Sequence, residues 1–222
     1  MADDRLIPDD TEWLAGRFSQ FVAAVLKGDP EGAAETGRVY APNEASRALL
    51  SGVLTQEYQF PDGFKGSRAA TLLAANETLR LLLAPVAASA ERDGLLDKWA
   101  AAYCPVCGAA PHLALIEGDE GRRFLSCGRC FTRWNFRRMV CPFCGEAGKD
   151  KTRYFTVEND VAHRVYVCDT CKHYLKSVDT RVKATPFARL EDLATIRLDI
   201  VAKREGYIRD TVDLVSVLVM GE

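Results

Sequence analysis

The sequence has no long uncharged apolar run, and no stretch approaches the ~18 residues that a membrane-spanning helix needs. Its N-terminus, MADDRLIPDDTEW, is acidic and lacks the basic segment and apolar run of a signal peptide. There are three histidines, and no HExxH pattern, phosphate-binding glycine loop or nucleophile–base pair is visible. We therefore expect a cytoplasmic protein with no membrane span that is not an enzyme.

Basic residues are scarce in the first half of the chain and concentrated later. Residues 1–100 carry 15 acids and 10 bases, whereas residues 121–183 carry 14 bases and 6 acids. The overall net charge of −2 hides this polarity. The basic part coincides with most of the cysteines.

All eight cysteines lie between residues 104 and 171, in two repeated units. Since thiols stay reduced in the cytoplasm, a disulfide framework is not expected. Each unit has two Cys-x-x-Cys pairs, and the first pair is always Cys-Pro-x-Cys-Gly. The predicted ligands of the first unit are Cys104, Cys107, Cys127 and Cys130, and those of the second are Cys141, Cys144, Cys168 and Cys171.

Two such pairs that face each other form a tetrahedral four-thiolate cage for one metal ion. Gly108 and Gly145 suit the left-handed turn that follows each first pair. We predict that each unit closes its own cage, with an interleaved pairing as the alternative. A closed cage leaves no open position for hydrolytic chemistry. Zinc and iron both accept four sulfurs, so spacing alone leaves the metal open.

Hydrophobic periodicity predicts an α+β fold with helices in the N-terminal part and short strands around the cysteines. Helices are expected over 10–27, from 43 to 54, from Ser67 to a kink or stop before Pro85, around 95–99, and over 190–203. Strands are expected over 112–116, 123–125, 131–134, 153–157 and 163–167, and residues 211–219 fit either a helix or a strand. The predicted domains are a helical domain (1–100), two tandem metal ribbons (101–140 and 141–183) and a C-terminal helical segment (184–222).

The cysteine-rich part resembles the formate dehydrogenase accessory protein family, FdhE. The resemblance rests on Cys-Pro-Val-Cys-Gly at 104–108, Gly-Arg-Arg-Phe-Leu-Ser-Cys at 121–127, the second cysteine unit with Tyr174-Leu-Lys, and Glu-Asp-Leu-Ala-Thr-Ile at 191–196. It covers residues 101–207, and the N-terminal part looks short for the family. It implies a non-enzymatic maturation factor or chaperone that docks on the catalytic subunit of formate dehydrogenase. It also implies two rubredoxin-like iron sites, with zinc as the alternative.

A run of arginines without any acid occupies residues 121–140, and its members are Arg122, Arg123, Arg129, Arg133, Arg137 and Arg138. The run is interpreted as a solvated surface, or as a docking patch for an acidic partner, for which we select Arg133, Arg137 and Arg138. Interleaved aromatics keep a zinc-ribbon nucleic-acid-binding protein as the alternative function, although the pI of about 6.0 weighs against it. A standalone electron carrier is a third hypothesis.

Other polar and aromatic residues near the cysteines are expected to have structural roles, because both cages are already complete. These residues are His112, His163, His173, Trp134 and Asp199. Trp134 is expected to pack under the first ribbon. Asp199 is expected to act as a cap or to pair with a ribbon arginine.

Overall fold

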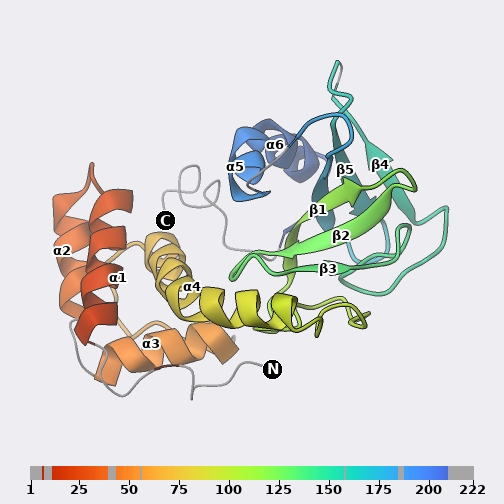
Figure 1. Cartoon of the computed structure of the whole chain (residues 1–222). Coiled ribbons are helices and arrows are strands. Elements are labelled where there is room, and N and C mark those ends of the chain that lie inside the picture. Colours follow the sequence, from red (N-terminus) through yellow and green to blue (C-terminus); the bar gives the residue numbers. More distant parts are fainter. Residues whose placement is uncertain are drawn as a thin grey trace. The chain divides into compact units, whose positions relative to one another are not determined.

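The computed structural model describes residues 7, 12–39, 44–55, 57–157, 159–184 and 188–209. They belong to two compact units, one within Met1–Val86 and one within Ala87–Thr211. The first is helical, and the second contains a β-sheet, both four-cysteine groups and two helices (Figure 1). The predicted α+β fold class is confirmed. None of the described helices has the length and apolar character that crossing a membrane requires.

The first unit is built from α1 (Glu12–Val25), α2 (Pro30–Val39), α3 (Glu44–Thr55) and α4 (Arg68–Arg92), the last of which runs on past Val86. Apolar side chains at helical spacing form the core, among them Leu14, Phe18, Val22, Leu49, Leu50, Val53, Leu79 and Leu83. The predicted cap at Ser67 is confirmed, since its hydroxyl accepts a hydrogen bond from the Ala70 amide at 3.2 Å. Asp10 and Thr11, either of which the sequence offers as a cap for the helix expected over 10–27, lie outside the described residues.

Two prolines lie in helical segments, and only one of them contradicts its prediction. The helix expected over 10–27 ends before Pro30 as predicted, and Pro30 takes the first position of α2, where a missing amide hydrogen has no consequence. Asp29 caps that helix by accepting a hydrogen bond from the Gly32 amide at 2.9 Å. Pro85 neither stops nor ends α4, which continues to Arg92. The carbonyl that Pro85 leaves without a partner belongs to Leu81, which is 39% exposed, so water can replace the lost bond.

Two further helix predictions are corrected. The chain around Leu95 forms turns instead of a short helix. The helix predicted over 190–203 is two helices, α5 (Ala188–Ala194) and α6 (Ile196–Arg204). They break at Thr195, whose hydroxyl donates to the Glu191 carbonyl at 2.8 Å and so competes with the backbone ladder. Residues 211–219 lie outside the described residues.

The sheet of the second unit has six strands in the order β3-β2-β1-β6-β5-β4. The strands are β1 (Pro111–Glu117), β2 (Arg122–Cys127), β3 (Arg133–Asn135), β4 (Thr152–Phe155), β5 (His163–Cys168) and β6 (Tyr174–Asp179). Each cysteine unit contributes three antiparallel strands, and β1 and β6 join the two halves in parallel, from Leu113↔Lys176 to Ile116↔Asp179. The proposed ribbons at 101–140 and 141–183 thus share one continuous sheet. β6, which lies at this seam, was not predicted.

Helices α5 and α6 cover one face of the sheet (Figure 1). Val165 and Val167 of β5 pack with Leu198 and Ala202 of α6 in one apolar cluster. Alternation along each strand places every second residue on this face.

Beneath α5 and α6, buried ion pairs lie at the seam of the sheet, which is the parallel pair of β1 and β6. The Lys176 amino group lies 2.6 Å from Asp199 and 2.8 Å from Asp192. Arg209 pairs with the same two carboxylates at 3.0 and 2.9 Å, and the Tyr174 hydroxyl donates to Asp199 at 2.8 Å. Asp199 therefore pairs with a lysine of β6 and with Arg209, not with an arginine of the predicted run. Burial opposes ionisation of Asp192, but the charges of Arg209, His112 and Lys176 outweigh it and hold its pKa at about 2.

Candidate metal centres

The structure brings the eight cysteines together in two groups of four. Cys104, Cys107, Cys127 and Cys130 form the first cage, and Cys141, Cys144, Cys168 and Cys171 form the second. Within each cage all four sulfurs lie within 4.8 Å of one another, and all eight cysteines are free thiols. The predicted sequential pairing is the one found, and the interleaved pairing is not.

Each cage is built from two backbone knuckles of the same design. The amide of Gly108 donates to the Cys104 carbonyl at 3.0 Å, and that of Gly145 donates to the Cys141 carbonyl at 3.0 Å. Both glycines have φ near +75°, at 74° and 78°, as the left-handed turn predicted. In the second knuckles, Phe131 and Lys172 take the equivalent left-handed conformation at φ 61°.

Backbone amides of the knuckles also point at the sulfurs. The Val106 amide lies 3.4 Å from the Cys104 sulfur, and the Phe143 amide lies 3.4 Å from the Cys141 sulfur. The Arg129 amide lies 3.3 Å from the Cys127 sulfur. Such hydrogen bonds stabilise the thiolate form that a metal requires.

The sulfur spacing fits an ion of the size of zinc or iron. A tetrahedron with metal–sulfur bonds of about 2.3 Å separates its sulfurs by roughly 3.8 Å. In the first cage the Cys104–Cys130, Cys107–Cys127 and Cys107–Cys130 sulfur distances are 3.5, 3.4 and 3.7 Å. In the second, the Cys141–Cys171 and Cys144–Cys168 distances are both 3.6 Å. The residues present fit one such ion in each cage.

Burial and mutual contact oppose the simultaneous ionisation of the four thiols in each cage. Burial raises the pKa of Cys127 well above its ordinary value, and it raises that of Cys141 to about 11. Hydrogen bonding to the Cys104 sulfur raises the pKa of Cys107. Four clustered sulfurs cannot all ionise without a compensating positive charge. A bound metal ion supplies that charge.

The two cages differ in exposure. All four cysteines of the first cage are buried, whereas in the second Cys144 is exposed and Cys171 is half-buried. The first cage has an additional hydroxyl close by, since Thr132 Oγ1 lies 3.0 Å from the Cys130 sulfur. The exposed side of the second cage is flanked by the stacked rings of Phe143 and His173, whose centroids are 4.8 Å apart.

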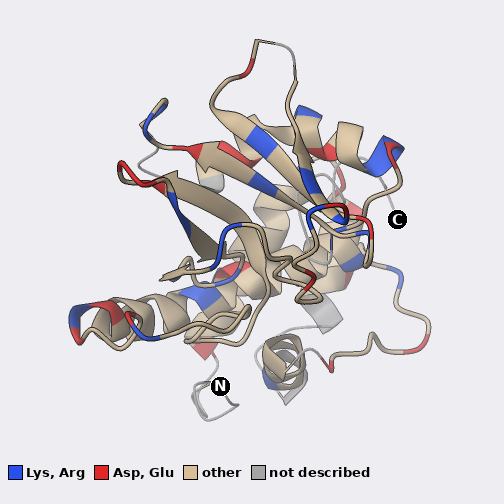
Figure 2. Ribbon diagram, turned by 90° about the vertical axis from the view of Figure 1, so that its right-hand side faces the viewer, with Lys and Arg blue, Asp and Glu red and all other residues tan. Residues whose placement is uncertain are grey.

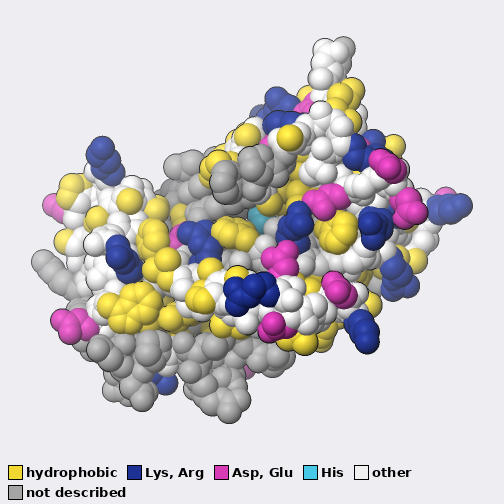
Figure 3. Space-filling view, in the orientation of Figure 1, with side chains coloured by type: hydrophobic (Ala, Val, Ile, Leu, Met, Phe, Trp, Pro, Cys, Tyr) yellow, Lys and Arg dark blue, Asp and Glu magenta, His cyan; other side chains and the backbone are white. Residues whose placement is uncertain are grey.

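The arginine run does not form one surface. Arg123 and Arg129 are buried, and Arg133 is exposed and pairs with Glu117 at 2.7 Å. Arg137 and Arg138 lie on the loop after β3 and are exposed. In Figure 2 basic segments are spread over strands and loops, and in Figure 3 basic and acidic side chains alternate over the sheet-bearing unit. A continuous basic track of the kind that nucleic acid requires is not present on the face in Figure 3.

The remaining residues selected from the sequence are held by the protein itself. Trp134 is 1% exposed, and its indole nitrogen donates to the Ala101 carbonyl at 3.0 Å, which confirms that it packs under the first ribbon. The ring nitrogens of His163 lie 2.7 Å from Asp160 and 2.6 Å from Glu191. His173 Nδ1 lies 2.9 Å from the Cys171 carbonyl. None of these side chains enters a cage.

Sequence reasoning missed Thr132 and the special position of Arg123. Thr132 follows the second knuckle of the first cage by two residues, which is a local signal for a hydroxyl near a sulfur. Arg123 looked like one member of a surface run. The alternation of β2, with Arg122 exposed and Arg123 buried, could have separated them.

Comparisons with known proteins cover the part of the chain that carries the two cysteine groups. The FdhE central-domain model matches residues 103–138, and the FdhE C-terminal-domain model matches residues 139–215, together about half of the chain. Protein FdhE homolog from Aquifex aeolicus (strain VF5) is 35% identical over 116 residues, which cover 51% of this chain and 41% of that protein. Protein FdhE from Escherichia coli O1:K1 / APEC is 32% identical over 114 residues, which cover 50% of this chain and 36% of that protein.

The chain therefore spans about two fifths of the length of the curated relatives it matches. Among solved structures, the crystal structure of the FdhE protein from Pseudomonas aeruginosa superimposes with a TM-score of 0.66. The match covers 89% of this chain and 70% of that chain, at 23% identity. At this identity the likeness concerns the fold.

Proposed function

Because the chain belongs to the FdhE family, we propose that it is a non-enzymatic accessory factor in the maturation of formate dehydrogenase. Family membership confirms the resemblance drawn from the cysteine pattern. The proposed partner is the catalytic subunit of formate dehydrogenase. Since the chain spans only part of its curated relatives, both the role and the partner are proposed for this chain and need experiments on this chain itself.

The observation that carries the proposal is the pair of closed four-thiolate cages. Cys104, Cys107, Cys127 and Cys130 would hold one ion, and Cys141, Cys144, Cys168 and Cys171 a second. Four protein ligands leave no position for a metal-bound water, so the centres suit folding or one-electron chemistry better than hydrolysis. We propose iron as the bound metal, with zinc as the alternative.

Arginines of the loop after β3 are the proposed docking surface. Arg137 and Arg138 have no ion-pair partner among the described residues, so their guanidinium groups are available to carboxylates of a partner. Arg133, at the start of β3, is the third proposed docking residue, but its pair with Glu117 already occupies part of its hydrogen-bonding capacity. We therefore assign the larger contribution to Arg137 and Arg138.

A pull-down with the catalytic subunit of formate dehydrogenase tests this surface. The double substitution Arg137→Glu with Arg138→Glu should abolish capture and leave the metal content unchanged, because neither residue touches a cage. The matched control, Lys149→Glu with Lys151→Glu, makes the same charge change on exposed residues between the two cysteine pairs of the second cage and should keep capture. Normal capture by the arginine variant would place the docking surface elsewhere.

A deletion strain tests the role itself. Cells without the protein should make the formate dehydrogenase polypeptide and show little formate-oxidising activity. Undiminished activity would contradict the proposal. A steeply salt-dependent gel shift with nucleic acid would then favour the zinc-ribbon alternative.

A further inference from the structure

Arg123 is a buried cation without a carboxylate partner. Its side chain is 2% exposed, and its one hydrogen bond runs from Nη2 to the Val140 carbonyl at 2.7 Å. Its guanidinium carbon lies 5.2 Å from the ring centroid of Phe136 and 5.9 Å from that of Tyr166. The Nε atom is buried and has no hydrogen-bond partner. A buried charge in this state is unfavourable unless an opposite charge compensates it.

The other deeply buried bases on the opposite face of the same sheet are compensated. Lys176 and Arg209, at 1% and 2% side-chain exposure, each pair with both Asp192 and Asp199. No carboxylate among the described residues lies within ion-pair distance of Arg123. The protein thus neutralises buried cations with carboxylates on the helix-covered face, and Arg123 needs another source of negative charge.

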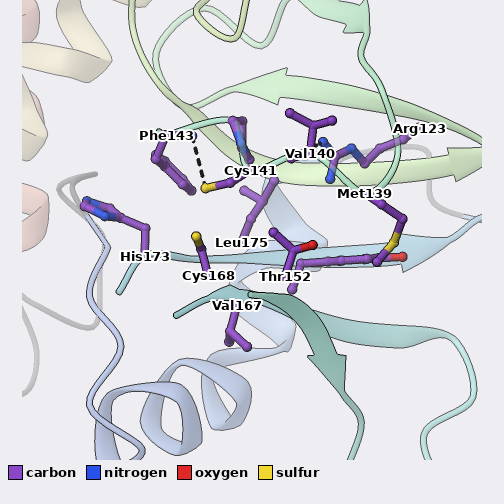
Figure 4. A pocket seen from close by; sticks show the side chains of 12 residues that line it. Arg123, Met139, Val140, Cys141, Phe143, Thr152, Val167, Cys168, His173 and Leu175 are labelled. Atoms are coloured by element: carbon purple, nitrogen blue, oxygen red, sulfur yellow. Dashed lines mark hydrogen bonds between the residues drawn. The ribbon is translucent and has the colours of Figure 1, made fainter. Parts of the chain in front are cut away.

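Arg123 and the second cage border the same cavity. Arg123 lines a cavity of about 20 Å³ together with Cys141 and Cys168, which are the two buried cysteines of that cage. Figure 4 shows Arg123 entering from β2 beside Val140, with the sulfurs of Cys141 and Cys168 turned toward each other on the far side of Val140. Among the twelve residues that line the cavity, Arg123 is the only lysine or arginine.

We propose that Arg123 is the buried counter-charge of the second metal centre. Four thiolates with one divalent ion carry a net charge of −2, which is delocalised over the sulfurs. Because Cys144 and Cys171 face solvent, water solvates that side of the cage, and the guanidinium of Arg123 compensates the buried side. A strand of the first half thereby stabilises the metal-loaded form of the second cage. This role rests on metal binding by the cages and is independent of the docking partner.

Charge substitution at Arg123 tests the proposal on the intact chain loaded with ¹¹³Cd, which reports each tetrathiolate site as a separate resonance. Competition with EDTA then gives the relative affinity of each site. Arg123→Met keeps the bulk and removes the charge, and it should weaken the second site about tenfold while the first site is unchanged. Arg123→Lys should restore most of the affinity. Arg164→Met is the matched control. Arg164 lies in β5, on the same face of the sheet as Arg123, and its substitution should weaken neither site.

The outcomes separate a charge role from a packing role. Equal weakening of both sites by Arg123→Met, or unchanged affinity of the second site, overturns the counter-charge. Absence of any cadmium at the second cage of the unaltered protein instead overturns the metal proposal on which it rests. If Arg123→Met does not fold, the NMR resonance of the Arg123 Nε–H group in the unaltered protein provides the test. This resonance should shift when cadmium fills the second cage, and an unchanged resonance overturns the proposal.

Discussion

The first and second cages have the same cysteine spacing and the same knuckle hydrogen bonds, yet they differ in their surroundings. The first is enclosed on all sides, and the Thr132 hydroxyl lies beside one of its sulfurs. The second exposes Cys144 to solvent and has a buried side that faces Arg123. The Cys-x-x-Cys motif therefore determines the local geometry of a site, and the packing around the motif determines its accessibility and its electrostatic environment.

From this difference we expect different tasks for the two centres. A metal ion in the enclosed cage would contribute chiefly to folding, because its ligands are part of the core of the first half. A metal ion in the second cage is closer to solvent, to a partner or to a reagent. If iron fills both cages, the second is the one placed for electron exchange with another protein.

The largest expected difference between the cages concerns loss of one ligand. Cys104→Ser and Cys144→Ser should each lower the metal content from two ions to one per chain. Because Cys104 is buried, its substitution should destabilise the unit by roughly 5 kcal/mol or more, and Cys144→Ser should have a clearly smaller effect. Metal analysis and urea unfolding measure the two quantities. Equal destabilisation by both variants would remove the distinction between the sites.

A substitution at the seam of the sheet should destabilise the fold without releasing either metal ion. Asp199→Asn leaves the buried charges of Lys176 and Arg209 under-compensated and should lower the free energy of unfolding by about 3–5 kcal/mol. Both metal ions should remain bound, since Asp199 touches neither cage. Urea unfolding with metal analysis provides the test. Selective loss of one metal ion would show that the two halves of the sheet unfold separately, although β1 and β6 join them.

Acid should act on the half that contains the first cage through His112. Burial lowers the pKa of His112 to about 4 from its ordinary 6.5. A histidine with a depressed pKa keeps the folded state fully stable above 6.5, and stability falls as the pH drops toward 4, because only the unfolded chain takes up the proton. Between pH 7 and pH 5 this amounts to about 2 kcal/mol.

Replacing His112 by phenylalanine provides the comparison. His112→Phe should show a loss of stability between pH 7 and pH 5 that is smaller by this amount in urea unfolding of the metal-loaded protein. Its lower stability at pH 7, from the lost contact of Nδ1 with the Ser126 carbonyl at 3.0 Å, does not affect the comparison of slopes. Identical slopes for the two proteins would show that His112 does not titrate in this range.

Local features could be predicted from the sequence, and long-range ones could not. The cages, the glycine turns and the strands over 112–116 and 163–167 follow from spacing and alternation within a few residues. β6 was missed because its sequence, YLKSVD, carries Lys176 and Asp179, and all six of its residues are nevertheless buried. Lys176 can be buried only because Asp192 and Asp199, far along the chain, fold back onto it. No local pattern contains that information.

The difference in solvent exposure between the two cages could not be predicted from the sequence. Both first knuckles have the same sequence pattern, Cys-Pro-x-Cys-Gly. The exposure of Cys144 and the burial of Cys104 depend instead on which other segments of the chain pack against each knuckle. The same holds for Pro85, whose tolerance within α4 depends on the exposure of one helical face.

The most direct test of two unequal metal centres is brief chelation followed by alkylation and mass spectrometry. The intact protein should carry two metal ions. After limited exposure to EDTA it should carry one, with the alkyl label on Cys141, Cys144, Cys168 and Cys171 and not on Cys104, Cys107, Cys127 and Cys130, because only the second cage is open to solvent. A starting ratio of one metal per chain, or labels that enter both groups of cysteines at the same rate, would contradict the account.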